Sequence, residues 1–251
     1  MRRSRSMPPR APLPRLARLA GLVSAGLVLA LWGRGIAATR STADHVWMAP
    51  DIANYPVGSI ALLPPATFDG SVDARKLVET AVGQALKGSG HRWVSAFLVR
   101  DYLLKAGGDS LGKALTQKLL KNPRIDSLDA PFVSRTLRAR ALLTVRVDQL
   151  ERRELEAGQT GRPSTTAQLR AALVDSTGRL LWTVYSNETL EGPQQEAESN
   201  VIGVKASGLN NEGIGNTTAA PPFMEVLSKV CQRWADSFPK RAAPDTSGTG
   251  K

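Results

Sequence analysis

Residues 164–187, STTAQLRAALVDSTGRLLWTVYSN, decide the fold because they predict two β-strands joined by a tight turn. Apolar side chains occupy every second position from Ala167 to Leu173, which is the period of a strand with one buried face. The next residues, DSTG (175–178), are of types that tolerate turn dihedrals. Residues 180–186 then predict the return strand, so the whole segment should form a β-hairpin.

Further strands are predicted upstream of the hairpin. Residues 142–151 alternate apolar and polar side chains and should lie beside the hairpin as a third strand. Residues 59–63, SIALL, are a continuous apolar run that stops at Pro64. This run predicts a buried first strand, because the proline has no amide hydrogen to donate to a ladder. Residues 93–95 predict another short strand.

Amphipathic helices account for most of the remaining domain. In residues 73–87, apolar side chains recur at three- and four-residue spacing, which predicts one buried face. The other predicted helices cover residues 96–105, 111–121, 131–140 and 223–238. This order of elements predicts an α/β fold in which a single mixed β-sheet packs against several amphipathic helices, as a two-layer or three-layer sandwich.

Residues 1–37 have the features of a targeting segment. A basic stretch precedes an uncharged apolar run of 14 residues at 19–32. Such a run spans about 21 Å as a helix, less than the roughly 30 Å of a bilayer core. We therefore predict a cleaved signal peptide and a periplasmic protein. The alternative is that residues 16–38 stay as a single-pass inner-membrane anchor, a tether that holds the domain outside the cytoplasm.

The rest of the chain divides by composition. We expect residues 38–58 to be a lead-in segment and residues 59–238 to be a single α/β domain. Within it, residues 191–220 are rich in Gly, Asn and Ser and predict a mobile loop. Residues 239–251 predict a disordered tail.

The net charge of +11 belongs mainly to the targeting segment. No acidic residue precedes Asp44, and removal of residues 1–37 takes away seven arginines. The remaining 26 basic and 22 acidic residues carry a net charge of only +4. We therefore predict no nucleic-acid partner.

No catalytic, cofactor-binding or metal-binding residue is predicted, and no cofactor is expected. The two histidines, His45 and His91, do not have the spacing of a metal site, so we expect both to be surface imidazoles. The single cysteine, Cys231, cannot form an internal disulfide. It falls on the apolar face of the last predicted helix, where cysteine commonly serves as packing material.

Four residues are candidates for contact with a partner. Arg135 and Arg138 lie on one predicted helix, as a solvated face or as a contact for an acidic protein or anionic lipid headgroups. The strand neighbours of Trp182 favour a core position for its side chain. If Trp182 instead faces outward with Tyr185 or Trp93, it would anchor a protein interface, where tryptophan is enriched.

Two motifs resemble the envelope lipoprotein superfamily that includes the curli-secretion protein CsgG, the TolB amino-terminal domain and activators of penicillin-binding proteins. Residues 60–64, IALLP, are similar to that family's opening strand, and residues 175–182, DSTGRLLW, are similar to its hairpin. The likeness extends over roughly residues 59–234. It implies a non-enzymatic envelope module that binds proteins or assembles complexes.

The sequence departs from this family in two respects. No cysteine follows the apolar run of the targeting segment, so a lipobox is missing. The loops at 151–164 and 191–220 lack the long alternating segments that a membrane pore needs. We therefore expect an exported, non-catalytic accessory module that binds another envelope protein. The alternative is a periplasmic enzyme or small-ligand-binding protein whose site is not readable from the sequence.

Overall fold

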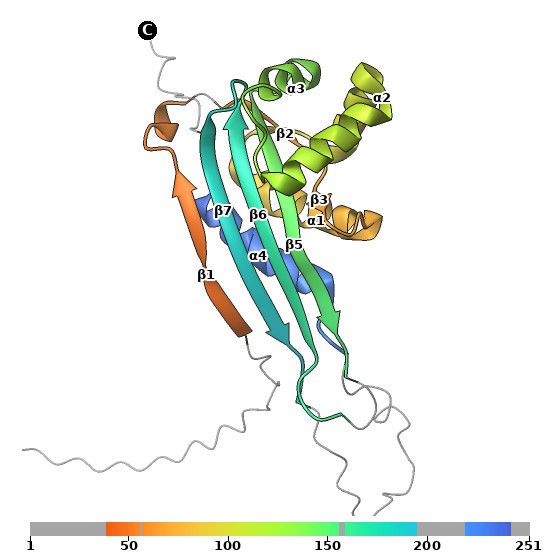
Figure 1. Cartoon of the computed structure of the whole chain (residues 1–251). Helices are drawn as coiled ribbons and strands as arrows, with labels where there is room; N and C mark the ends of the chain where they lie inside the picture. Colours follow the sequence, from red (N-terminus) through yellow and green to blue (C-terminus); the bar gives the residue numbers. More distant parts are fainter. Residues whose placement is uncertain (1–38, 56, 156–158, 195–218, 242–251) are drawn as a thin grey trace, which may run out of the picture. The chain divides into compact units, whose positions relative to one another are not determined.

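The computed structural model describes residues 39–55, 57–155, 159–194 and 219–241. It contains a seven-stranded mixed sheet in the order β1-β7-β6-β5-β2-β4, with β3 paired to β5 off this path (Figure 1). The strands are β1 (Thr39–Met48), β2 (Ser59–Leu62), β3 (Ala66–Thr67), β4 (Arg92–Val94), β5 (Ala141–Arg153), β6 (Ser164–Asp175) and β7 (Leu180–Glu191). The helices are α1 (Val72–Leu86), α2 (Ala96–Lys121), α3 (Ala130–Leu137) and α4 (Phe223–Ser237), with short 3-10 turns η1 (Ile52–Asn54) and η2 (Lys87–Ser89).

The predicted hairpin is the centre of the sheet. β6 and β7 pair antiparallel with Leu173 opposite Trp182, and β5 pairs antiparallel with β6. On the other side of β5, the pairing becomes parallel through β2 to β4. The predicted α/β fold with a single mixed sheet and packed helices is thereby confirmed.

The amino-terminal strand was not expected. Residues 38–58 predict only a lead-in, but Thr39–Met48 is a strand that pairs antiparallel with β7. A register shift between Thr42 and His45 interrupts the ladder, which explains why the segment lacks a clean alternation of apolar and polar residues. The strand forms because β7 offers an unpaired edge, and that edge is far away in the sequence.

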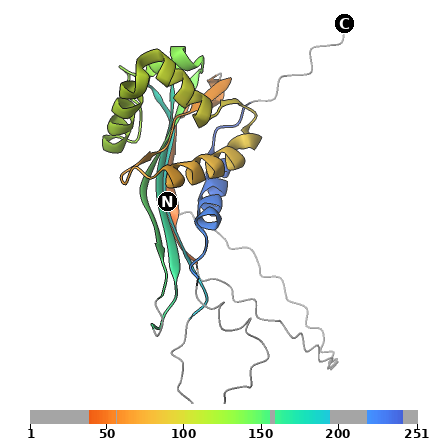
Figure 2. The same cartoon turned by 90° about the vertical axis from the view of Figure 1, so that its right-hand side faces the viewer.

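Helices cover the two faces of the sheet unequally. Figure 2 shows α1 and α4 together on one side of the sheet, where they bury one core with Leu143. α2 and α3 pack on the opposite side and bury a second core with Leu142. Neighbouring strand residues point to opposite faces, so a strand buried on both sides is apolar throughout. This is why Ile60–Leu63 form a continuous apolar run rather than an alternating one.

An ion cluster around one buried carboxylate joins α4 to β1 and β7. The Glu188 carboxylate is fully buried on β7 and receives a hydrogen bond from Arg233 at 2.6 Å. Lys229 lies 3.3 Å from the same carboxylate, and Asp44 on β1 accepts from Arg233 at 3.0 Å. A buried carboxylate is costly unless it is paired, so these contacts fix the position of α4 against the edge of the sheet.

Several predictions fall outside the described residues. They concern the targeting segment 1–37, the tether at 16–38, most of the loop 191–220 and most of the tail 239–251. In the ranges that the structure covers, no helix combines the length and the apolar character needed to cross a bilayer.

Candidate functional site

An acidic side chain with a lowered pKa, Asp175, lies at the hairpin turn. Asp175 accepts hydrogen bonds from the Tyr55 hydroxyl at 2.5 Å and from the Thr177 amide at 2.7 Å. Burial raises the pKa of Asp175, but the hydrogen bonds from Tyr55, Thr177 and Arg179 outweigh it and hold that pKa below 3.8. The same contact with Asp175 raises the pKa of Tyr55 to about 12. Both carboxylate oxygens are engaged, so this cluster closes the turn rather than moving protons.

The other reactive side chains are also structural. His91 is buried, with its two ring nitrogens 2.8 Å from the Val57 carbonyl and 2.9 Å from the Pro239 carbonyl. The expectation of a surface imidazole is therefore wrong for His91, because the residues after α4 fold back over it. Burial raises the pKa of Cys231 to about 12, which makes its thiol a weak nucleophile. Among the described side chains, no group of three or more His, Cys, Asp or Glu is placed to hold a metal ion.

The four predicted contact residues do not form one surface. Trp182 is fully buried and lies edge-on to the rings of Trp234 and Phe238, with centroids 6.2 and 5.1 Å away. Because its side chain is inaccessible to solvent, Trp182 does not face outward and cannot contact a partner directly. Arg135 and Arg138 are exposed at the end of α3, where Arg138 adopts a left-handed conformation.

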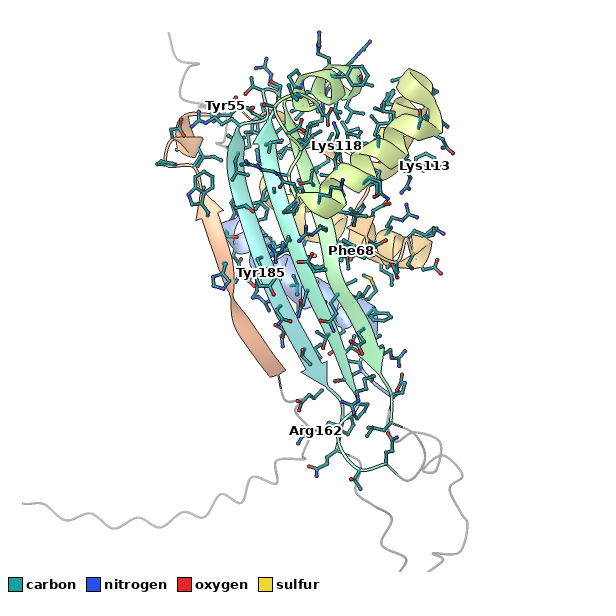
Figure 3. The ribbon with its side chains drawn as sticks, in the orientation of Figure 1. Tyr55, Phe68, Lys113, Lys118, Arg162 and Tyr185 are labelled. Atoms are coloured by element: carbon teal, nitrogen blue, oxygen red, sulfur yellow. The ribbon has the colours of Figure 1, made fainter. Side chains whose placement is uncertain are left out.

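Tyr185 belongs to a row of side chains across the sheet face opposite α4 (Figure 3). The Arg170 guanidinium lies 4.8 Å from the centre of the Tyr185 ring, and the His45 ring stacks with the Tyr185 ring at a centroid distance of 6.1 Å. Arg170 and Arg146 each donate to Asp148 at 2.6 Å, and Arg146 continues the row to Phe68. The charged and aromatic groups of this row are engaged with one another, so the row stabilises the part of the sheet face that no helix covers.

A groove of about 650 Å³ lies along α2. Its walls are mainly apolar and come from both arms of α2, from the segment after β2 and from Arg75 of α1. The apolar lining residues are Leu63, Pro64, Phe97, Leu103, Leu104, Leu115 and Leu119. Phe97 is 70% exposed and Leu104 is 55% exposed, so the groove presents apolar surface to solvent.

Two glycines shape this groove. Gly107 and Gly108 depart from helical dihedrals and divide α2 into two arms with a kink between them. The sequence pattern places these glycines between two separate helices. Gly108 has φ +65° and ψ −169°, a conformation that residues with a Cβ rarely adopt. The bend turns the second arm toward the first and leaves the apolar space between them.

The charges at the rim are largely paired. Arg100 donates to Glu79 at 2.5 Å, and Lys105 donates to Asp101 at 2.7 Å. Lys113, labelled on α2 in Figure 3, lies 3.7 Å from Asp109. The groove therefore offers an apolar interior with a rim of mutually neutralised charges, which suits apolar side chains better than an ionic ligand.

One feature of the sequence could have predicted that this surface is apolar. Residues 97–99 and 102–104, FLV and YLL, place apolar side chains around more of the helix than one buried face requires. Val99 and Leu103 enter the core, whereas Leu98 and Tyr102 stay exposed beside Phe97. An excess of apolar residues on a surface helix is thus the feature that could have predicted the groove.

No protein-family model and no curated protein sequence matches this chain. A search of solved structures matched the crystal structure of lipoprotein GNA1162 from Neisseria meningitidis at 17% identity and a TM-score of 0.43, covering 71% of this chain and 99% of that one. The PelC dodecamer from Paraburkholderia phytofirmans matched at 15% identity and a TM-score of 0.35, covering 83% and 100%. The hypothetical protein CT253 from Chlamydia trachomatis matched at 14% and 0.31, covering 72% and 92%. At this identity and TM-score, the matches assign the chain to no family.

Proposed function

We propose that this chain is an exported, non-catalytic module that binds another protein of the cell envelope through the groove on α2. The observation that carries the proposal is the exposed apolar lining of the groove. Large exposed apolar patches on soluble domains commonly mark interaction sites. Phe97 and Leu104 are the anchor residues of this surface, because they line the groove and remain largely exposed.

The bound segment would insert apolar side chains between the arms of α2. Such a segment is an amphipathic helix with its apolar positions on one face, the usual occupant of an apolar groove in protein recognition. The paired charges at the rim leave the polar face of that helix in water. The targeting segment, residues 1–37, would place the module outside the cytoplasm.

The test is to fill the groove without disturbing the fold. A Cβ added at Gly112, which lines the groove, meets no atom within 4 Å. Gly112→Leu should therefore occupy the binding space. Gly83→Leu is the matched control, because Gly83 is exposed on α1 and its added Cβ also meets nothing within 4 Å.

The readout is site-specific photo-crosslinking in intact cells, with a photoreactive phenylalanine at position 97. We expect one protein adduct in the envelope fraction, lost with Gly112→Leu and kept with Gly83→Leu. The converse crosslink, from an apolar residue of the captured protein back to α2, identifies the bound helix. Equal adducts in both variants would mean that the groove does not bind the partner.

A second candidate is a small apolar ligand, which the groove volume favours. Ligand sites are typically apolar concavities of about 300–1,000 Å³, and this groove holds about 650 Å³. Titration of the purified protein with a fluorescent fatty-acid analogue separates the two functions. Saturable binding that Gly112→Leu abolishes, without a protein adduct in cells, would favour the small ligand.

A further inference from the structure

We propose that two copies of this chain pair through the outer edge of β1, in an antiparallel arrangement centred on Trp47. β1 is an edge strand of the sheet and pairs with β7 through only one of its two edges. Its other edge presents backbone donors and acceptors with no neighbouring strand among the described residues. This inference is independent of the groove on α2.

The edge has few of the features that prevent pairing. Natural edge strands are commonly blocked by proline, lysine, a bulge or a covering element. Thr39–Met48 contains neither proline nor lysine, and its single irregularity lies between Thr42 and His45. From His45 to Met48 the ladder is regular, which leaves a straight segment available for a further strand.

Apolar side chains of the core face are also exposed to solvent at this edge of the sheet. Val46 pairs with Val184 and Met48 pairs with Trp182, and both partners belong to the core under α1 and α4. Val184 and Trp182 are 1% and 0% exposed, whereas Val46 and Met48 are 42% and 38% exposed. Another strand beside β1 would bury these two side chains.

The segment is complementary to itself. Opposite residues in an antiparallel pair lie on the same face of the sheet, and a two-fold axis at Trp47 satisfies this condition. Each Trp47 then lies beside its symmetry mate on the outer face, and each Val46 lies opposite Met48 of the second copy on the core face. Cross-strand aromatic and aliphatic pairs of this kind are favourable.

Charge also favours a second copy. Between His45 and Ala49 the strand carries no carboxylate, ammonium or guanidinium group, so two copies meet without like-charge repulsion. The nearest acidic side chain, Asp44, is already engaged by Arg233 at 3.0 Å. The contact is small beside the roughly 1,200–2,000 Å² of a stable interface, so the dimer should be weak and depend on concentration.

The register is tested by cysteine scanning of the full-length protein. Cys231 is buried and its pKa is raised to about 12, so it should stay unreactive during oxidation. Trp47→Cys would place two thiols on the two-fold axis, where opposite Cα atoms are about 4.5–5.5 Å apart, within disulfide range. We expect disulfide dimers to be most abundant with Trp47→Cys and at least five-fold less abundant with Val46→Cys or Met48→Cys alone.

Two controls complete the scan. Mixing the Val46→Cys and Met48→Cys proteins should restore cross-linking, because these two positions face each other across the axis. Gly83→Cys, on the exposed surface of α1, should give only background. A yield that does not peak at position 47, or that is equal at position 83, would contradict the register.

Sedimentation of the wild-type protein provides the second readout. The weight-average mass should rise toward that of a dimer with concentration, and Trp47→Lys should remain monomeric because it places two ammonium groups at the axis. Trp47 is 46% exposed, so unchanged circular dichroism checks that this variant folds. Phe97→Lys, in the groove, should still dimerise. A wild-type monomer at every concentration, or an edge that cross-links only to a different protein, would overturn the proposal.

Discussion

At the scale of single residues, Asp175 and Tyr55 connect the hairpin turn to the segment after β1. Asp175 is predicted as a turn residue from local sequence, and the structure adds a hydroxyl donor from Tyr55 at 2.5 Å. Arg179 extends the contact, because it bonds Asp51 at 2.5 Å. The turn is thereby fixed by residues that are distant in the sequence.

The Tyr55–Asp175 contact predicts a specific pH dependence of stability. The pKa of Tyr55 is raised from 10.0 to about 12, so the folded state favours the neutral phenol. The contribution of this hydrogen bond to the free energy of unfolding is complete below pH 10 and is lost as the pH rises toward 12. The pKa of Asp175 is lowered from 3.8, so its contribution is lost as the pH falls below that value.

Tyr55→Phe should lower the free energy of unfolding at pH 7 by about 1.5–3 kcal/mol, the range for a hydrogen bond to a charged group. The variant should also lose the additional decline in stability between pH 10 and 12. Denaturant unfolding, followed by tryptophan fluorescence across this range, measures both effects. Parallel stability curves for the variant and the wild type would contradict the assignment.

At the scale of elements, the bend in α2 creates the groove. Gly107-Gly108 was predicted to separate two helices, and the structure places a sharp change of direction there. At Gly107, a Cβ would lie 2.9 Å from the Leu111 Cβ, so this position also requires glycine. The groove therefore depends on the positive φ of Gly108 and on the absence of a side chain at Gly107.

Gly108→Ala should destabilise the protein by about 1–3 kcal/mol, because the alanine would have to adopt a positive φ in a sparsely populated region. Gly112→Ala, in the second arm of the same helix, should instead stabilise it by about 0.5–1 kcal/mol through helix propensity. Thermal unfolding should show Tm changes of opposite sign, about 2–4 °C for each kcal/mol. Equal changes would mean that the bend is not held by Gly108.

At the scale of the whole molecule, the two layers of helices differ in how completely they cover the sheet. α1 and α4 complete a core with the long strands, and the ion cluster of Glu188 and Arg233 holds α4 in place. α2 and α3 cover only part of the other face, and several apolar side chains of α2 remain exposed to solvent. Apart from Val46 and Met48 at the edge of β1, the large exposed apolar side chains of the described residues therefore lie mainly on the side of α2 and α3.

The targeting segment leads to a prediction about the mature chain. If residues 1–37 form a cleaved signal, the intact mass of the mature protein should be lower than 26.9 kDa by the mass of those residues. This species should be found in the soluble periplasmic fraction. Full-length protein in the membrane fraction would instead establish residues 16–38 as a tether.

Local patterns were sufficient for most elements. The hairpin at 164–187 and the helix that became Val72–Leu86 depend on side-chain periodicity and turn chemistry within one segment. Such signals hold because each segment must bury one face, whatever its neighbours are. The fold class followed from the order of those segments.

Long-range contacts were decisive elsewhere. Thr39–Met48 became a strand because the edge of β7 was free, and His91 became buried because residues after α4 cover it. The groove combines Pro64, Phe97 and Thr116, which come from separate parts of the chain. The sequence by itself thus determined the elements and the class of fold, because periodicity is local. Only the tertiary structure decided which edge and which apolar side chains stay exposed, because exposure depends on what every other segment covers.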